Sequence, residues 1–197
     1  MRLSKWLGAL IACAGVSSAG AQEFNIVTEV RGGITMSGLE LYPWDPNAIW
    51  NVVTPVPGSF NLSNIDSVQF NVLFGAPDVG AFEWLGTLRP ALGGVISLSG
   101  RESLVHAGLN WQIPLGDVFY LEAEGGVAIH NGALQGATAP LRNLGCPVLF
   151  HWAYGVGANL TENWTVTATF QHASNIIFGC YPNQGINHLG VSLGYKF

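Results

Sequence analysis

The chain has 197 residues, with seven Lys and Arg against twelve Asp and Glu, and a formal net charge of −5 at pH 7. This balance excludes the basic surface that nucleic-acid binding requires, so we expect no nucleic-acid partner. Only 10% of the residues are charged, whereas 26 are Gly and 11% are aromatic, a composition more typical of a transmembrane β-barrel than of a soluble enzyme.

Residues 1–21 have the pattern of a secretory signal peptide. Arg2 and Lys5 form a short basic region, residues 6–16 are mostly apolar, and Ala19-Gly20-Ala21 has the small-x-small form of a cleavage site. Cleavage would leave 22–197 as a single domain with a net charge of about −7. That domain contains no apolar run long enough for a membrane helix.

From residue 24 onward, apolar and polar residues alternate in short segments, which is typical of strands with one apolar and one polar face. Eight strands are predicted, most of them about 10–14 residues long, the length that a tilted strand needs to cross a bilayer. They cover approximately 24–35, 67–75, 83–98, 103–113, 118–130, 148–160, 164–175 and 186–197. Pro90 and Gly93-Gly94 predict a bulge or kink inside the third strand.

Apart from the short connection after the third strand, the connections between these strands alternate in length. With both termini periplasmic, the long connections 36–65, 131–147 and 176–185 are extracellular, and the connections after the second, fourth and sixth strands are short and periplasmic. Trp44 and Trp50 in the first long connection are candidates for contact with lipid headgroups or, alternatively, for packing over the barrel mouth.

The two faces of the strands favour an eight-stranded antiparallel transmembrane β-barrel. The apolar face points outward, and the small and polar inward face fills the interior with a network of charges. The inward residues include Glu29, Arg31, Arg89, Glu122, Glu124, His151, Gln171 and Lys196. The alternative is a secreted β-sandwich or lipocalin-like barrel with the aliphatic face buried.

The seventh predicted strand carries the residues with catalytic chemistry. Period two places His172 and Ser174 on its apolar face, about 7 Å apart at Cα, so the imidazole is within reach of the hydroxyl. A Ser activated by a His base is the minimal unit of nucleophilic acyl transfer. His-x-Ser alone is a weak signal, because two polar residues at the membrane interface would give the same pattern.

The residues around this pair add a resemblance. His172-Ala173-Ser174-Asn175 and Pro182-Asn183-Gln184-Gly185-Ile186-Asn187 resemble the motifs of the PagL-like lipid A 3-O-deacylase family, over about residues 170–197. Members of that family are eight-stranded barrels that hydrolyse an ester-linked acyl chain of lipopolysaccharide. The resemblance implies the outer membrane of a Gram-negative bacterium as location, and lipid A and outer-membrane lipids as partners.

The resemblance also implies roles for individual residues. Ser174 is expected as nucleophile, His172 as general base, and Asn175 as an oxyanion donor. Asn187 stands where the family has an acid, so the acceptor for the His ring is retained while its charge is absent. Ile177 stands where the family tends to have Gly, and Gly179 is the expected replacement donor. The acyl chain is expected to lie against Phe150, Trp152 and Phe170.

The cysteines and histidines lead to two further expectations. Cys146 and Cys180 form an even pair in an oxidising compartment, so a disulfide is expected. The histidines at 106, 130, 151 and 188 are scattered along the chain, and no metal site or cofactor is expected. The alternative to an enzyme is a weak or inactive family member that serves as a structural or adhesive barrel.

Overall fold

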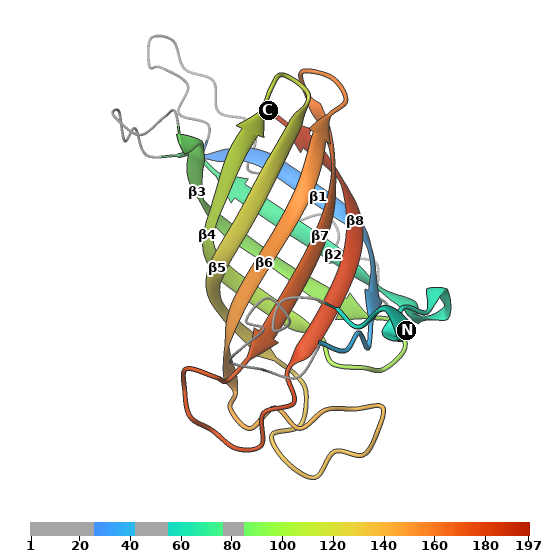
Figure 1. Cartoon of the computed structure of the whole chain (residues 1–197). Helices are drawn as coiled ribbons and strands as arrows, with labels where there is room; N and C mark the ends of the chain where they lie inside the picture. The colour runs from blue at the N-terminus through green and yellow to red at the C-terminus, as the bar shows by residue number, and fades with distance from the viewer. Residues whose placement is uncertain (1–25, 42–54, 77–84) are drawn as a thin grey trace, which may run out of the picture.

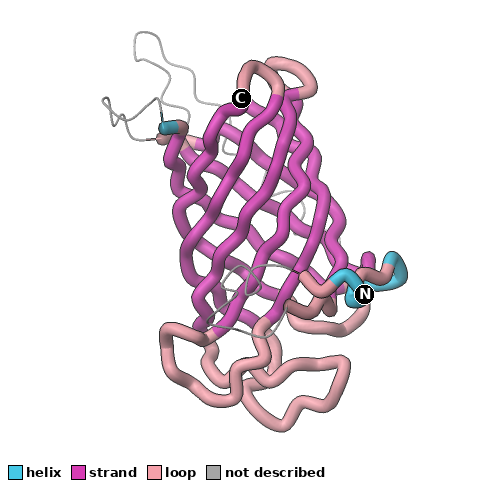
Figure 2. Tube along the Cα trace, viewed as in Figure 1, coloured by secondary structure: helices cyan, strands magenta, loops and turns pink. Residues whose placement is uncertain are grey.

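The computed structural model describes residues 26–41, 55–76 and 85–197, in which eight antiparallel strands close into one barrel (Figures 1 and 2). Each strand pairs with its sequence neighbours, and β8 closes the barrel against β1. The strands are β1 (Val27–Ser37), β2 (Ile65–Phe74), β3 (Thr87–Ser97), β4 (Leu104–Leu115), β5 (Phe119–His130), β6 (Val148–Asn159), β7 (Trp164–Ser174) and β8 (Ile186–Lys196). Two short 3-10 helices, η2 (Pro57–Ser59) and η3 (Leu62–Asn64), precede β2. The expected signal peptide and Trp44 and Trp50 lie outside the described residues.

Side chains alternate between the two surfaces of the barrel as the sequence predicts. The outer surface carries a band of exposed aliphatic and aromatic residues that includes Ile34, Leu92, Leu109, Trp111, Leu121, Val127, Val156, Val191 and Leu193. The polar residues that alternate with them along each strand point into the barrel and are buried. A surface this apolar requires a lipid environment, which confirms the transmembrane barrel and excludes the soluble alternatives.

The inward charges form the expected network. Arg31 contacts Glu29 at 2.8 Å and Glu122 at 2.7 Å, and Arg89 contacts Glu29 at 3.3 Å. Tyr120 adds a hydrogen bond to Thr167 at 2.6 Å across the interior. Buried charges of this kind are tolerated only when they are paired, so the network fills the interior without leaving isolated ions.

The third strand differs from its prediction. It begins at Thr87 rather than near residue 83, so the connection from β2 to β3 is longer than expected. Pro90 produces no bulge, because β3 and β4 keep one register through the Pro90 and Leu109 pair. The ladder between β2 and β3 ends at Ala91, so Pro90 needs no donor on that side. The register shifts lie in β1 instead, one of them between Val27 and Glu29.

Two of the long connections and two of the tight turns lie at opposite ends of the barrel, as the sequence predicts. The loops 131–147 and 175–185 extend from one end, and the C-terminus and the tight turns 116–118 and 160–163 lie at the other (Figure 1). In the part of the chain that is described, no helix has the length and apolar character needed to span a membrane.

Candidate active site

His172 on β7 and Asn187 on β8 are direct cross-strand partners. The Nδ1 of His172 lies 2.5 Å from the Oδ1 of Asn187, and Asn187 Nδ2 donates to the carbonyl of Leu39 at 2.8 Å. A carbonyl can only accept, so the Asn187 amide must turn Nδ2 toward Leu39 and Oδ1 toward the imidazole. His172 therefore carries its proton on Nδ1, and its Nε2 keeps a free lone pair.

Ser174 follows His172 on the same face of β7 and is 4% exposed. Gly185 adopts a φ of +63° beside both residues, and a Cβ placed there would lie 2.9 Å from His172 Cε1 and 3.5 Å from Ser174 Cβ. Both side chains therefore border the same small space in front of Gly185. In the described part of the chain the Ser174 hydroxyl makes no hydrogen bond to His172, a bond that frequently tightens only when substrate is bound.

An aromatic cluster adjoins the His172 ring. The Trp152 ring lies 5.2 Å from that of His172 and 5.7 Å from that of Phe170, and Tyr154 lies 5.4 Å from Phe170. Phe150 is the cross-strand partner of Ser174. The three residues expected to contact the acyl chain therefore lie on one face, beside the His172 and Ser174 pair.

This face is not open to lipid along its whole length, contrary to the expectation from the sequence. Phe170 is only 3% exposed, because Leu39 packs against it in one cluster with Met36, and Leu41 and Leu189 border that cluster. The segment after β1 thus folds back over the outer ends of β7 and β8. The same segment supplies the carbonyl that holds Asn187.

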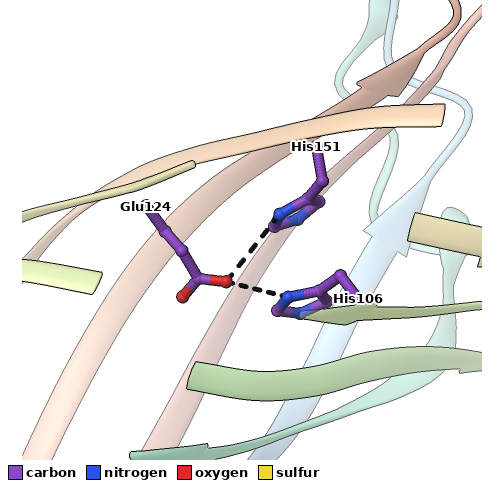
Figure 3. Close-up of side chains that lie close together, drawn as sticks. All are labelled: His106, Glu124 and His151. Carbon is purple, nitrogen blue, oxygen red and sulfur yellow. Dashed lines mark ion pairs between the residues drawn. The ribbon is translucent and has the colours of Figure 1, made fainter. Parts of the chain in front are cut away.

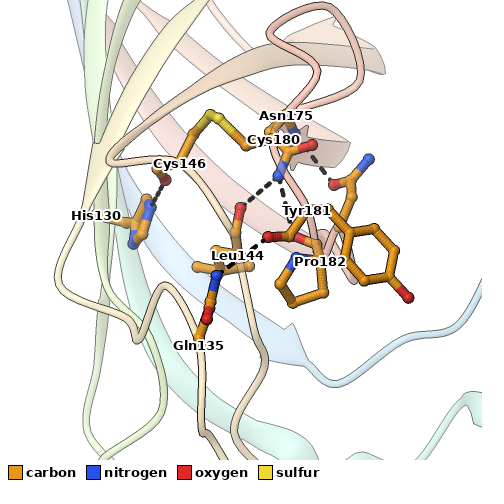
Figure 4. Close-up of a disulfide and its surroundings, with 9 residues drawn as sticks. His130, Gln135, Leu144, Cys146, Asn175, Cys180, Tyr181 and Pro182 are labelled. Carbon is orange, nitrogen blue, oxygen red and sulfur yellow. Dashed lines mark hydrogen bonds between the residues drawn. A yellow bond between two sulfur atoms is a disulfide. The ribbon is translucent and has the colours of Figure 1, made fainter.

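Both expected oxyanion donors are engaged in other hydrogen bonds. The Nδ2 of Asn175 donates to the carbonyls of Leu144 at 2.6 Å and Pro182 at 3.1 Å (Figure 4), and its backbone N–H donates to the Asn183 side chain. The Gly179 N–H donates to the Asn175 carbonyl at 3.2 Å. Asn175 therefore fixes the loop that follows the candidate nucleophile.

The backbone N–H groups of the two residues after Asn175 are available to bind an oxyanion. Within the described residues, the N–H groups of Ile176 and Ile177 have no hydrogen-bond acceptor. They belong to the turn in which the N–H of Phe178 donates to the Asn175 carbonyl at 2.8 Å. The sequence did not reveal them, because every residue type except Pro has a backbone N–H.

A disulfide joins the two loops beside the site. Cys146 and Cys180 are bonded with a Cα–Cα distance of 5.6 Å, linking loop 131–147 to loop 175–185 (Figure 4). The Cys146 carbonyl lies 2.7 Å from His130 Nε2. Cys146 and Leu144 pack in one buried cluster with Ala173, the residue between His172 and Ser174. The loops around Ser174 are therefore held by covalent, polar and apolar contacts together.

One cluster of interior side chains is not indicated by the sequence. The sequence places Glu124 and His151 in the interior network but does not connect His106 with them, whereas the closure of the barrel brings all three together in its interior (Figure 3). They lie on three different strands, and only the strand register reveals that they converge.

The chain is similar to known proteins both in its barrel fold and in the part of the sequence that contains the candidate site. Residues 82–196 match the family model described as lipid A 3-O-deacylase (PagL). The crystal structure of the outer membrane enzyme PagL superimposes with a TM-score of 0.51 at 16% identity, covering 86% of this chain and 99% of that one. The N-terminal β-barrel domain of Pseudomonas aeruginosa OprF matches with a TM-score of 0.51 at 11% identity, covering 86% and 98%.

No curated protein sequence is significantly similar to the chain. At these identities the two structures establish the barrel fold alone. The family match covers more than half of the chain and includes all of β7 and β8. The chain therefore belongs to the lipid A 3-O-deacylase (PagL) family of outer-membrane β-barrels.

Proposed function

We propose that this protein hydrolyses the ester bond of the acyl chain at the 3-O position of lipid A, with Ser174 as nucleophile and His172 as general base. The observation that carries the proposal is the hydrogen bond from His172 Nδ1 to Asn187 Oδ1. It leaves the Nε2 lone pair free to take a proton, which is the tautomer a general base needs. The family match supports the substrate class.

The mechanism follows from these positions. His172 Nε2 accepts the Ser174 proton while Ser174 Oγ attacks the ester carbonyl. The tetrahedral intermediate then collapses, the sugar hydroxyl leaves with the proton from His172, and an acyl-Ser174 ester remains. A water molecule activated by His172 hydrolyses that ester and releases the fatty acid. Throughout, Asn187 holds the imidazole in its working tautomer.

The oxyanion of the intermediate would be bound by backbone N–H groups. The N–H of Ile177 has no acceptor among the described residues, and it lies in the turn that directly follows Ser174 and Asn175. A single well-placed donor of this kind lowers the barrier by about 2.7–4 kcal/mol. Because the donor belongs to the backbone, Ile in place of the family's Gly does not remove it.

The acyl chain would lie along the aromatic cluster. Tyr154 is 40% exposed and Trp152 is partly exposed, whereas Phe170 is buried. An acyl chain on the exposed edges of Trp152 and Tyr154 would reach Phe150, which is opposite Ser174. This path leads from the outer surface of β6 to the ester-cleaving residues.

Mass spectrometry of lipid A from cells that express the protein tests the proposal. Wild-type protein is expected to remove one 3-O-linked acyl chain, and Ser174→Ala should leave lipid A unchanged. Ser192→Ala is the matched control, because Ser192 is also buried but lies on the inner face of β8. Intact lipid A in cells with folded wild-type protein would refute the proposal.

One observation favours a second candidate function. Asn187 provides no negative charge to stabilise the imidazolium, so the chain could serve as a structural or adhesive barrel with little activity. The two functions are separated by Asn187→Glu, which restores the family's acid. A strong gain in deacylation identifies a weakened enzyme, whereas no activity in either form identifies a structural barrel.

A further inference from the structure

We propose that His106, Glu124 and His151 form a binding site for a transition-metal ion, with Zn²⁺ as the expected occupant, inside the barrel. The three side chains come from the adjacent strands β4, β5 and β6 and point toward one another (Figure 3). All three are buried, and their ligand atoms lie within 4.8 Å of one another. The site is separate from Ser174, which lies on the outer face of β7.

The distances place one carboxylate oxygen between two imidazole nitrogens. Glu124 Oε1 lies 2.8 Å from His106 Nδ1 and 3.8 Å from His151 Nδ1. The two rings are stacked, with their centroids 4.0 Å apart and an angle of 16° between their planes. Because the rings are stacked, their Nδ1 lone pairs are nearly parallel, so metal binding would require the rings to tilt until both lone pairs meet one ion beside Glu124.

The same three atoms have unused bonding capacity. His106 Nδ1, Glu124 Oε1 and His151 Nδ1 are buried, and none has a hydrogen-bond partner of good geometry in the described part of the chain. Buried polar atoms are almost always satisfied, so three atoms that lie within 4.8 Å of one another around one point, and that form no hydrogen bond of good geometry, require an explanation. A metal ion at that point would satisfy all of them.

A neighbouring hydrogen-bond chain sets the tautomer of His151. Gln171 Nε2 donates to Gln69 Oε1 at 3.1 Å, so Gln171 turns its Oε1 toward His151 Nε2, 3.3 Å away. His151 therefore carries its proton on Nε2 and keeps a lone pair on Nδ1, the nitrogen that faces Glu124. Metal-bound histidines are typically held in this way, with the second ring nitrogen donating to a carbonyl or carboxylate.

The space beside the cluster fits a single ion or water molecule. A cavity of about 30 Å³ lies there, bordered by the cluster and also by Asn71 and Asn110. The Nδ2 groups of these two residues donate to Glu124 Oε2 at 3.2 and 3.4 Å, while their Oδ1 atoms have no donor among the described residues. Either oxygen is a candidate for a fourth ligand.

The charges around the cavity also favour a cation. Among the described residues, Glu124 forms no ion pair with Arg or Lys, unlike Glu29 and Glu122. Arg31 borders the cavity too, but Glu29 and Glu122 hold and neutralise it. Glu124 therefore lacks a permanent positive partner among the described residues, and a divalent ion would supply one.

The donor set selects the class of metal. Two imidazole nitrogens with one carboxylate oxygen suit Zn²⁺ and neighbouring first-row ions, whereas Mg²⁺ and Ca²⁺ prefer oxygen ligands throughout. Bound there, the ion would join β4, β5 and β6. His151 precedes Trp152, whose ring contacts His172, so the ion would also stiffen the wall behind the candidate active site.

The test uses the full barrel refolded in detergent with Zn²⁺ and then freed of unbound metal by gel filtration. Mass spectrometry of the metal content is expected to find about one Zn²⁺ per folded barrel. Zn²⁺ should also raise the thermal unfolding temperature, because a ligand that binds only the folded state stabilises it. Wild-type protein that folds but retains no Zn²⁺ would overturn the proposal.

Variants assign the metal to this cluster. His151→Gln and Glu124→Gln should lose the bound Zn²⁺ and its stabilising effect. His188→Gln is the matched control, because His188 is equally buried in the interior but belongs to no such cluster, and it should keep both. Equal loss in the control, or full retention in the cluster variants, would contradict the assignment.

A milder variant covers the case in which cluster variants fail to fold. Gln171→Leu removes the acceptor for His151 Nε2–H but leaves all three ligands in place. It should weaken Zn²⁺ binding about 10-fold or more, as is usual when the partner of a metal-bound His is removed. Unchanged affinity in folded Gln171→Leu protein would count against coordination through His151 Nδ1.

Discussion

His172 and Asn187 face each other across β7 and β8, and their Nδ1 and Oδ1 atoms are 2.5 Å apart. The second contact of Asn187, from Nδ2 to the Leu39 carbonyl, fixes which end of the amide faces the ring. An amide held in this way can orient the imidazole, which is one role of the acidic residue in a catalytic triad. It cannot perform the other role, which is to stabilise the imidazolium by its negative charge.

Asn187→Leu tests the orienting part. Leu has a similar size but offers no acceptor, so the His172 ring loses its fixed tautomer and orientation. Deacylation kcat/KM should fall by about 100-fold or more, the lower range of what a positioned general base contributes. The assay is release of fatty acid from purified lipid A by the detergent-solubilised protein. Unchanged kcat/KM in folded Asn187→Leu protein would show that Asn187 does not orient the base.

Asn187→Glu tests the missing charge and has two opposing effects. The carboxylate should raise deacylation, because it stabilises the imidazolium that forms during attack. It should also lower the free energy of unfolding by about 1–3 kcal/mol, because a carboxylate cannot donate to the buried Leu39 carbonyl. Activity is measured on lipid A and stability by urea unfolding. Lower stability with no activity in either the variant or the wild-type protein would contradict the proposed enzyme.

Gly185→Ala should disturb His172 directly. A Cβ at Gly185 would lie 2.9 Å from His172 Cε1, and the residue has a φ of +63°. Gly179→Ala is the control, because Gly179 has a similar φ of +67° but nothing within 4 Å of the added atom. Both variants should lose about 1–2 kcal/mol of stability through backbone strain, but only Gly185→Ala should lose most of its deacylase activity. Equal activity in the two variants would refute the contact.

The barrel could be predicted from the sequence because its strongest signal is local. Apolar residues at every second position, as in Val105, Ala107, Leu109 and Trp111, specify one lipid-facing side regardless of the neighbouring strands. The family motif and the alternation also place Asn187 on the same outward face as His172 and on the adjacent strand, and the structure adds that the two residues are direct cross-strand partners.

The remaining features depend on contacts between distant parts of the chain. Leu39 covers Phe170, and nothing in the sequence around either residue indicates that contact. The Asn175 side chain donates to the Leu144 and Pro182 carbonyls because two long loops fold against each other. The cluster of His106, Glu124 and His151 requires the register of three strands, which alternation alone does not give.

Asn175→Asp tests the structural role that the hydrogen bonds give this residue. Asp keeps the size of the side chain but replaces both Nδ2 donors with an oxygen that faces the Leu144 and Pro182 carbonyls. The loss of both hydrogen bonds, with a carboxylate oxygen now facing two carbonyl oxygens, should cost about 1–3 kcal/mol of stability. Asn163→Asp is the control, because Asn163 makes one similar bond in an exposed turn where water can replace it. Equal losses in thermal unfolding would contradict the role.

Glu29→Gln should destabilise the barrel more than any loop variant. The Glu29 side chain is fully buried and accepts from Arg31 at 2.8 Å, Thr165 at 2.9 Å and Arg89 at 3.3 Å. Without its charge, two buried guanidinium groups lose a shared partner, a loss that typically costs about 3–5 kcal/mol. Urea unfolding followed by Trp fluorescence measures the change.

The matched control is Glu40→Gln, which breaks the ion pair with Arg142. The Glu40 side chain is 58% exposed, so water screens the pair and the change in stability should stay below about 1 kcal/mol. A Glu29→Gln barrel as stable as Glu40→Gln would mean that Arg31 and Arg89 find other partners. The interior network would then not depend on the carboxylate at its centre.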